Sequence, residues 1–140
     1  MTGSGHSNRA PVLWGLVVGA VQCASPLALR WLDQATVQAL LLAMIAGVYV
    51  GFAVADGRPR VIAVESSVTA AFVLLAAAAV TGSAWLLVLG YAGHGLKDFW
   101  QHRSQYVSGT RWWPPFCAAV DFLVAVVLVV EIAAGVALHR

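Results

Sequence analysis

The sequence predicts an all-α integral membrane protein, a polytopic chain folded as a single bundle of five transmembrane helices. Of its 140 residues, 61% are hydrophobic and only 10% are charged, and the mean hydropathy is +0.83. A soluble domain usually has about a quarter of its residues charged, so this chain lacks the polar surface that water requires. Apolar stretches of about 20 residues recur, and each is long enough to cross a hydrocarbon layer of roughly 30 Å.

Polar or proline-containing breaks divide the chain into five apolar segments. We predict membrane-spanning helices over residues 11–32, 35–55, 61–80, 84–102 and 115–138. The connecting loops are short, so neighbouring helices should pack antiparallel as one domain over residues 11–140. Residues 1–10 form a polar tail that we expect to be disordered.

Basic residues predict the orientation of the bundle, because they concentrate on the cytoplasmic side of membrane proteins. With five spans, the N-terminal tail, the second loop and the fourth loop share one side. That side holds five of the eight basic residues, namely Arg9, Arg58, Arg60, Arg103 and Arg111. We therefore expect a cytoplasmic N-terminus and an external C-terminus, in a multi-pass protein of the bacterial inner (plasma) membrane.

Charge and cysteine content argue against several other classes of protein. The formal net charge is only +2 and is scattered, without the basic stripe that nucleic-acid binding requires. Cys23 and Cys117 lie far apart in apolar stretches. We interpret them as small buried hydrophobic residues, not as a redox pair or a zinc knuckle. The expected partner is a membrane lipid or a lipid-soluble small molecule, and no nucleic acid.

The loop before the fifth segment contains Trp112 and Trp113, followed by Pro114 and Pro115. Tryptophan is enriched at the headgroup layer. Anchoring is therefore the favoured interpretation, and a lipid-gripping lid over a site is the alternative. The two prolines should forbid helix at that point, and the helix should resume in the fifth segment.

The fourth segment carries the densest polar chemistry. Its sequence GYAGHGLKDFWQHR (residues 90–103) places His94, Asp98 and His102 at intervals of four residues, on one helix face. Lys97 joins the same broad side, whereas Trp100 lies on the opposite, apolar side. Ionisable groups inside a span are costly unless they are paired or wetted. This face should therefore line the interior of the bundle.

Other segments contribute acids at a matching depth. Glu65 and Asp121 lie near the cytoplasmic ends of the third and fifth segments. Asp56 closes the second segment, with Tyr49 two turns deeper on a similar face. Topology thus predicts a layer in the cytoplasmic leaflet, above His94, that holds Asp56, Glu65, Asp98, His102 and Asp121.

Each of these residues also has a purely structural interpretation. Lys97 could neutralise Asp98 or Asp121 in a buried ion pair. Asp56 could pair with an arginine of its own loop. Glu65 could be protonated and bonded to a neighbouring carbonyl. Because the acids converge from several segments, we favour function for the set as a whole.

We interpret the convergence as an enzyme embedded in the membrane, acting on a lipid-soluble, isoprenoid- or sterol-like substrate. Imidazole and carboxylate groups suit acid–base catalysis and require no cofactor, so an isomerase, hydratase or hydrolase is expected. The catalytic candidates are His94, Asp98, Glu65 and Asp121. The binding candidates are Lys97, His102, Tyr49, Asp56, Trp100, Trp112 and Trp113.

A divalent metal is an alternative for the same cluster, since imidazole and carboxylate bind zinc, iron and manganese. The metal-ligand candidates are His94, Asp98, His102, Glu65 and Asp121. On a straight helix His94 and His102 lie about 12 Å apart, so they could not readily bind one ion together. The positive charge of Lys97 beside them also disfavours a cation.

Two further functions stay open. A proton or small-ion transporter would use the same residues as a relay, with Glu131 either continuing a polar path outward or pairing with Gln22. The ionisable groups crowd the cytoplasmic half, and no inverted repeat is seen, which weakens this hypothesis. An accessory membrane subunit that assembles as a homo-oligomer would use small residues such as Ala76–Ala79 for helix packing.

Overall fold

The computed structural model describes residues 8–139, and within them it contains five α-helices and no β-strand. The helices are α1 (Arg9–Ala28), α2 (Gln34–Asp56), α3 (Pro59–Thr81), α4 (Trp85–Ser104) and α5 (Trp113–Ala133). The predicted all-α class is therefore confirmed for this part of the chain. Most of the predicted polar tail, residues 1–7, lies outside the described residues, as does Arg140.

The ends of α2 follow from local sequence signals. Asp33 precedes the helix, and its Oδ1 accepts a hydrogen bond from the Thr36 amide at 2.6 Å, which satisfies one of the free amides of the first turn. The helix ends at Gly57, whose φ of 80° is a left-handed conformation that glycine adopts without strain. Pro59 then opens α3, where its missing N–H has no helical partner to lose.

The first helix is shifted relative to the prediction. It begins at Arg9 and ends at Ala28, whereas residues 11–32 were expected. Pro26 stands in the last turn and cannot donate a backbone hydrogen bond. The helix stops soon after it, and residues 29–33 connect α1 to α2.

The fifth helix differs from the prediction at both ends. Pro114 and Pro115 lie in its first turn, so the expectation that they forbid helix was wrong. Proline is tolerated there because first-turn amides have no intrahelical acceptor. After the helix the chain turns at Gly135, with a φ of 79°. The Leu138 carbonyl then accepts a hydrogen bond from the Ala35 amide at 3.0 Å, so the C-terminal segment folds back onto the start of α2.

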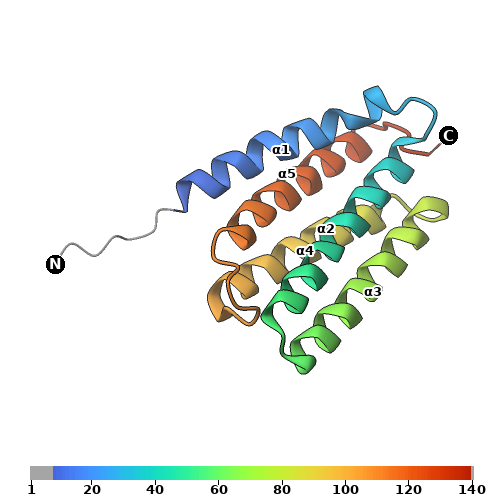
Figure 1. The fold of residues 1–140 in the computed structure, drawn as a ribbon. Coiled ribbons are helices and arrows are strands. Elements are labelled where there is room, and N and C mark those ends of the chain that lie inside the picture. The colour runs from blue at the N-terminus through green and yellow to red at the C-terminus, as the bar shows by residue number, and fades with distance from the viewer. Residues whose placement is uncertain (1–7, 140) are drawn as a thin grey trace.

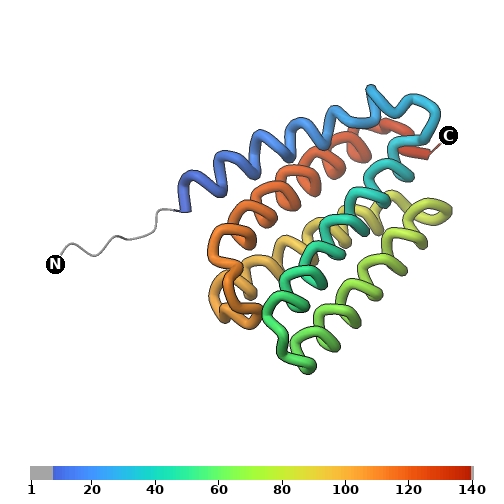
Figure 2. Tube along the Cα trace, viewed as in Figure 1, coloured from blue at the N-terminus to red at the C-terminus, as the bar shows by residue number. Residues whose placement is uncertain are grey.

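The bundle consists of two helix pairs joined by α4. α1 packs along α5, and α2 packs along α3 (Figure 1). α4 packs mainly against α5 and also contacts α3 and α2. α1 and α2 meet only weakly, and they diverge from their shared loop toward the start of α1 (Figure 2). This divergence leaves one side of α5 covered by neither helix.

Two glycines fix α1 against α5. A Cβ atom built on Gly15 would clash with the Phe116 carbonyl and the Ala119 side chain, and one built on Gly19 would press on Val120 and Leu123. Small residues at this spacing allow the backbones of two membrane helices to approach closely. The α1–α5 contact is thus a close packing of backbones.

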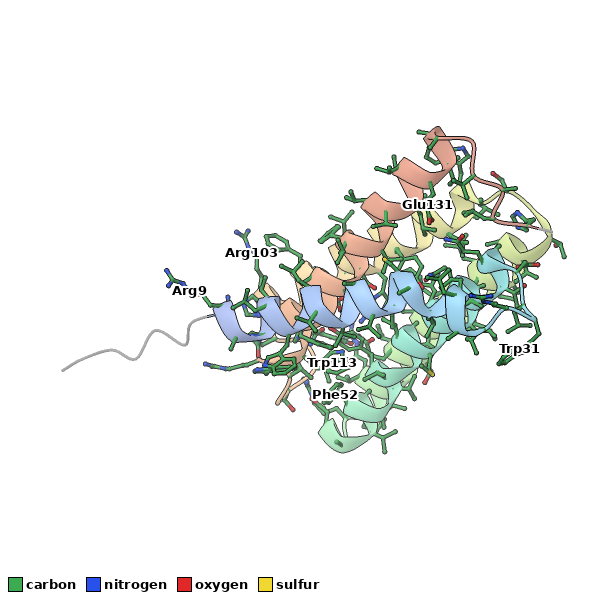
Figure 3. All side chains as sticks on the ribbon, turned by 90° about the horizontal axis from the view of Figure 1, so that it is seen from above. Arg9, Trp31, Phe52, Arg103, Trp113 and Glu131 are labelled. Atoms are coloured by element: carbon green, nitrogen blue, oxygen red, sulfur yellow. The ribbon has the colours of Figure 1, made fainter. Side chains whose placement is uncertain are left out.

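The charged ends of the helices agree with the predicted antiparallel order. Arg9 at the start of α1 and Arg103 near the end of α4 lie at one end of the bundle, and Trp31 in the α1–α2 loop lies at the other (Figure 3). Arg9 and Arg103, two of the five basic residues predicted on the cytoplasmic side, therefore share one end of the bundle.

Much of the exposed surface is apolar, and several polar side chains, among them Glu65 and Asp121, are buried with the hydrophobic core. Within residues 8–139, the four helices α1, α2, α3 and α5 are long and apolar enough to cross a membrane. α4 is more polar, but His94 and Asp98 on it are buried, whereas Leu96 and Leu89 are 63% and 59% exposed. The polar residues in its middle therefore face the inside of the bundle, and its exposed polar residues, Arg103 and Ser104, lie at its end.

Candidate functional site

The centre of the polar interior is His94, which lies between two carboxylates. Its Nδ1 is 2.7 Å from Asp121 Oδ2 on α5 and 3.4 Å from Asp98 Oδ2, one turn along α4. The side chains of all three are at most 1% exposed. The predicted convergence of His94, Asp98 and Asp121 is present in the structure.

Cys117 belongs to the same cluster. It lies one turn before Asp121 on α5, and its thiol contacts Asp121 Oδ2 at 3.9 Å. His94, Asp98, Cys117 and Asp121, here called the α4–α5 group, each offer one ligand atom, and these atoms lie within 4.8 Å of one another. Sequence reasoning treated Cys117 as an isolated hydrophobic residue. The signal that could have found it is the four-residue spacing that places it on the Asp121 face.

A second polar pair adjoins the α4–α5 group through Tyr49. The Tyr49 hydroxyl donates to Asp98 Oδ1 at 2.5 Å, and the Lys97 ammonium lies 3.4 Å from the centre of the Tyr49 ring. Lys97 Nζ is in turn 2.8 Å from Glu65 Oε2 on α3. Lys97 thus neutralises Glu65, and not Asp98 or Asp121 as considered from the sequence. Side chains of α2, α3, α4 and α5 form one continuous polar chain.

The two carboxyl groups of the α4–α5 group are paired with His94, and within residues 8–139 neither forms an ion pair with a lysine or arginine. Within residues 8–139, His94 Nε2, Asp98 Oδ2 and Asp121 Oδ1 have no hydrogen-bond partner. Asp98 and Asp121 contribute two carboxylates, and the nearby Lys97 is already paired with Glu65. Buried charges of this kind require pairing or a coordinated metal. An imidazole, a thiol and two carboxylates are a ligand set that binds divalent transition metals.

His102 and Asp56 lie outside the α4–α5 group. His102 Nε2 is 3.1 Å from the side-chain amide of Asn8, at the start of α1. Asp56 Oδ1 accepts from Arg58 Nε at 2.6 Å, and its Oδ2 accepts from the Ser108 hydroxyl at 2.6 Å. The hydrogen bond from Arg58 to Asp56 raises the pKa of the Arg58 guanidinium above its ordinary value. The predicted single layer is thus divided. Asp56 links the α2–α3 loop to the α4–α5 loop, and His102 faces α1.

The tryptophans predicted to bind or anchor lie at the same end of the bundle, outside the α4–α5 group. Trp100 is half exposed and its ring packs against Tyr106. Trp112 is also half exposed and stacks on Phe116. Trp113 is partly buried and contacts Phe52 and Phe116. Anchoring at the headgroup layer remains a prediction.

A separate polar network lies toward the other end of the bundle. Gln22 Nε2 donates to the Tyr91 hydroxyl at 2.7 Å, and the Tyr91 hydroxyl donates to the Gln38 carbonyl at 2.7 Å. Glu131 does not pair with Gln22, as one hypothesis proposed. Its Oε2 accepts from Gln34 Nε2 at 2.6 Å.

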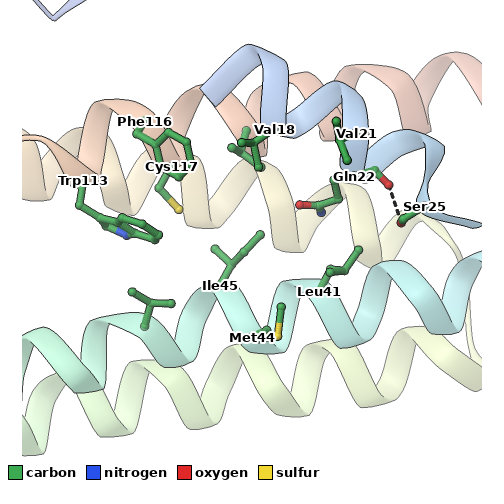
Figure 4. A pocket seen from close by; sticks show the side chains of 12 residues that line it. Val18, Val21, Gln22, Ser25, Leu41, Met44, Ile45, Trp113, Phe116 and Cys117 are labelled. Carbon is green, nitrogen blue, oxygen red and sulfur yellow. Dashed lines mark hydrogen bonds between the residues drawn. The ribbon is translucent and has the colours of Figure 1, made fainter. Parts of the chain in front are cut away.

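Two cavities adjoin the α4–α5 group, on different sides. The first, of about 370 Å³, lies between α1, α2 and α5 and is lined by Cys117 (Figure 4). The second, of about 310 Å³, lies between α1, α4 and α5 and is lined by Asp98 and His102. The group therefore stands between two spaces that open on different faces of the bundle.

No family model, no curated protein and no solved structure matches this chain. Function must therefore be argued from the chemistry of the site alone. That site contains a buried histidine, cysteine and two aspartates that could hold a metal ion, in a helical chain with the character of a membrane protein.

Proposed function

We propose that this protein is a small membrane-embedded enzyme that binds one divalent metal ion at the α4–α5 group and uses it for acid–base chemistry on a lipid-soluble molecule. The observation that carries the proposal is the convergence of His94, Asp98, Cys117 and Asp121 within 4.8 Å. All four side chains are buried in a part of the bundle whose exposed surface is apolar.

The distances fit a metal with short bonds. A tetrahedral zinc-type ion with bonds of about 2.0–2.3 Å holds its ligand atoms roughly 3.3–3.8 Å apart. His94 Nδ1 and Asp98 Oδ2 are separated by 3.4 Å, which lies within this range. The 2.7 Å contact between His94 and Asp121 would have to widen when an ion enters.

Charge supports the same assignment. A divalent cation balances the carboxylates of Asp98 and Asp121, while Lys97 and Glu65 balance each other. His94, Asp98 and Asp121 would hold the ion, and a position beside Cys117, which lines the adjoining cavity, would be left for a substrate. A catalytic metal keeps such an open position, where it polarises a carbonyl or lowers the pKa of a bound water.

The proposal includes the orientation predicted from the basic residues, with all five helices across the membrane and the N-terminus in the cytoplasm. α4 can cross despite its polarity, because His94 and Asp98 in its middle are buried against other helices, Lys97 is paired with Glu65, and the exposed Arg103 lies at its end.

Elemental analysis of the detergent-purified protein tests the proposal directly. We expect about one equivalent of a transition metal per chain in the wild type, and its loss in both His94→Ala and Asp98→Ala. His102→Ala is the matched control, since His102 lies on α4 but faces Asn8, and it should retain the metal. A wild type that contains no metal and takes up no added zinc, iron or manganese would overturn the proposal.

A proton relay is the second candidate. Polar groups occur at several depths: Asp98 and His94, then the Tyr91 network, then Glu131 with Gln34. Protein reconstituted in vesicles with an internal pH dye separates the two functions. A proton flux that is abolished by Tyr91→Phe as well as by His94→Ala would favour the relay, because Tyr91 lies outside the proposed metal site.

A further inference from the structure

We propose that the cavity between α1, α2 and α5, here called the α1–α2–α5 cavity, binds the hydrocarbon body of a lipid-soluble isoprenoid-type molecule. The inference rests on the proposed function only in calling that molecule a substrate. The binding itself can be measured without a metal.

The walls of the cavity are apolar side chains from three helices. Val18 and Val21 come from α1, Leu41 and Ile45 from α2, and Phe116 from α5 (Figure 4). Its volume of about 370 Å³ lies within the roughly 300–1,000 Å³ typical of small-molecule sites. The shape and chemistry of the space therefore fit a compact hydrocarbon.

Gln22 and Ser25, which line the cavity, are already bonded within the protein, whereas the buried Trp113 Nε1 in the same wall has no hydrogen-bond partner. The Ser25 hydroxyl donates to the Gln22 carbonyl at 2.6 Å. Gln22 Nε2 donates to the Tyr91 hydroxyl at 2.7 Å. No charged residue lines the cavity. A hydrated ion or a phosphate headgroup would lose its water there and gain no charged partner.

Two of the helices that form the cavity are each held against a helix other than their partner across the cavity. α1 is held on α5 by the close contacts of Gly15 and Gly19. α2 is held on α3, where the Thr69 hydroxyl donates to the Ala46 carbonyl at 2.9 Å. Each wall is thus fixed to another partner, and the space between α1 and α2 persists.

The cavity opens to the apolar surface and reaches the α4–α5 group. Val21 and Met44, at its rim, are 67% and 65% exposed. Cys117, in its inner wall, is the member of the α4–α5 group that lines this space. A molecule that enters sideways from the hydrocarbon layer would therefore come to rest beside the proposed open position of the metal.

The lack of charge in the cavity favours a free isoprenoid over a membrane phospholipid. The walls reach from Trp113 at the start of α5 to Ser25 near the end of α1, and no residue that lines them could pair with a charged headgroup. A phospholipid acyl chain has the same hydrocarbon chemistry, so the experiment includes both molecules.

Photolabelling of the full-length protein in lipid nanodiscs tests the inference. The first probe is a diazirine analogue of farnesol, and the second is a phosphatidylcholine with a diazirine in its acyl chain. We expect the farnesol analogue to label the cavity walls around Met44 and Ile45 saturably, with competition by unlabelled farnesol. The phospholipid should label exposed α3 residues such as Leu74 without saturation.

Two variants of matched size make the result specific. Ile45→Trp fills the cavity and should reduce saturable labelling several-fold. Leu74→Trp adds the same ring to a side chain that is 71% exposed on α3, and should leave the labelling unchanged. Both should keep the circular dichroism spectrum of the wild type, which shows that Ile45→Trp folds whether or not the protein holds a metal.

The outcomes separate this inference from the proposed function. Saturable farnesol labelling in a protein without metal would support the cavity and overturn the metal enzyme. A metal-loaded protein in which farnesol does not compete, or in which the phospholipid labels the cavity equally well, would overturn the cavity inference alone. Equal labelling of Ile45→Trp and the wild type would also overturn it.

Discussion

His94 Nδ1 lies 2.7 Å from Asp121 Oδ2 and joins α4 to α5 inside the bundle. The His94 and Asp121 side chains are 1% and 0% exposed, so water does not screen the interaction. Asp98, one turn from His94, adds a second carboxylate to the same space. This concentration of acceptors around one imidazole is the feature from which the metal proposal follows.

Replacing Asp121 with asparagine should weaken metal binding strongly. Loss of even an outer-shell partner typically lowers metal affinity by about 10–100-fold, so loss of a charged ligand should cost more than tenfold. Competition with a chelator for zinc measures the change. Asp56→Asn is the control, since Asp56 binds Arg58 and Ser108, and its zinc affinity should match the wild type. Equal affinities for Asp121→Asn and the wild type would refute the ligand assignment.

Replacing Cys117 with alanine should change zinc affinity much less than Asp121→Asn does. Cys117 Sγ is 3.9 Å from Asp121 Oδ2, and two carboxylates already balance a divalent ion. The same chelator competition compares the two variants. Complete loss of metal in Cys117→Ala would show a closed four-ligand site, which is the arrangement of a structural metal. The catalytic part of the proposal would then fail.

Cysteine accessibility should reveal the orientation of the bundle. Ser83 lies in the α3–α4 connection and Ser104 at the end of α4, and both are exposed. With a cytoplasmic N-terminus, Ser83→Cys should react with a membrane-impermeant maleimide on intact cells. Ser104→Cys should react only after the membrane is opened. The reverse pattern would invert the orientation, and labelling of both on intact cells would show that α4 does not cross.

The helices and the core of the candidate site could be predicted from the sequence because both follow local rules. Apolar length identifies the helices. A spacing of four residues places His94 and Asp98 on one face, and the polarity of that face requires burial. The order of short loops then brings Asp121 to the same depth. Each step uses only the order of the residues along the chain.

The parts that were missed depend on tertiary contacts. Asp56 leaves the predicted layer because the α4–α5 loop brings Ser108 to its carboxylate. Lys97 forms its ion pair with Glu65 because α3, which carries Glu65, packs beside α4. Cys117 enters the group because it shares a helix face with Asp121, and this becomes important only when α4 supplies His94 opposite. Pairings between helices have no signature along the chain, unlike the four-residue spacing of Cys117 and Asp121 within α5.

Replacing Lys97 with methionine should destabilise the protein. The change keeps the length of the side chain but leaves the Glu65 carboxylate, which is 1% exposed, without its partner at 2.8 Å. Breaking a buried pair in this way typically costs about 3–5 kcal/mol. The double variant Lys97→Met with Glu65→Gln removes both charges and should recover most of the loss. Thermal unfolding in detergent, followed by circular dichroism, measures all three proteins. An unchanged midpoint in the single variant would show that the pair contributes little.

Alanine at Gly15 and at Gly47 should have opposite effects, although both glycines lie in helices and begin a G-x-x-x-G sequence. A Cβ at Gly15 meets the backbone carbonyl of Phe116, which cannot move without displacing α5. Overpacking of this kind costs about 1–3 kcal/mol. A Cβ at Gly47 meets no atom within 4 Å, so the higher helix propensity of alanine should stabilise α2 by up to about 1 kcal/mol.

Thermal midpoints of the two alanine variants in the same detergent give the comparison. A lower midpoint for Gly15→Ala and an equal or higher one for Gly47→Ala would show that close α1–α5 packing holds one wall of the α1–α2–α5 cavity in place. If Gly15→Ala unfolds at the wild-type temperature, α1 is free to shift on α5. The cavity would then no longer be a fixed space, and its shape could adapt to whatever molecule occupies it.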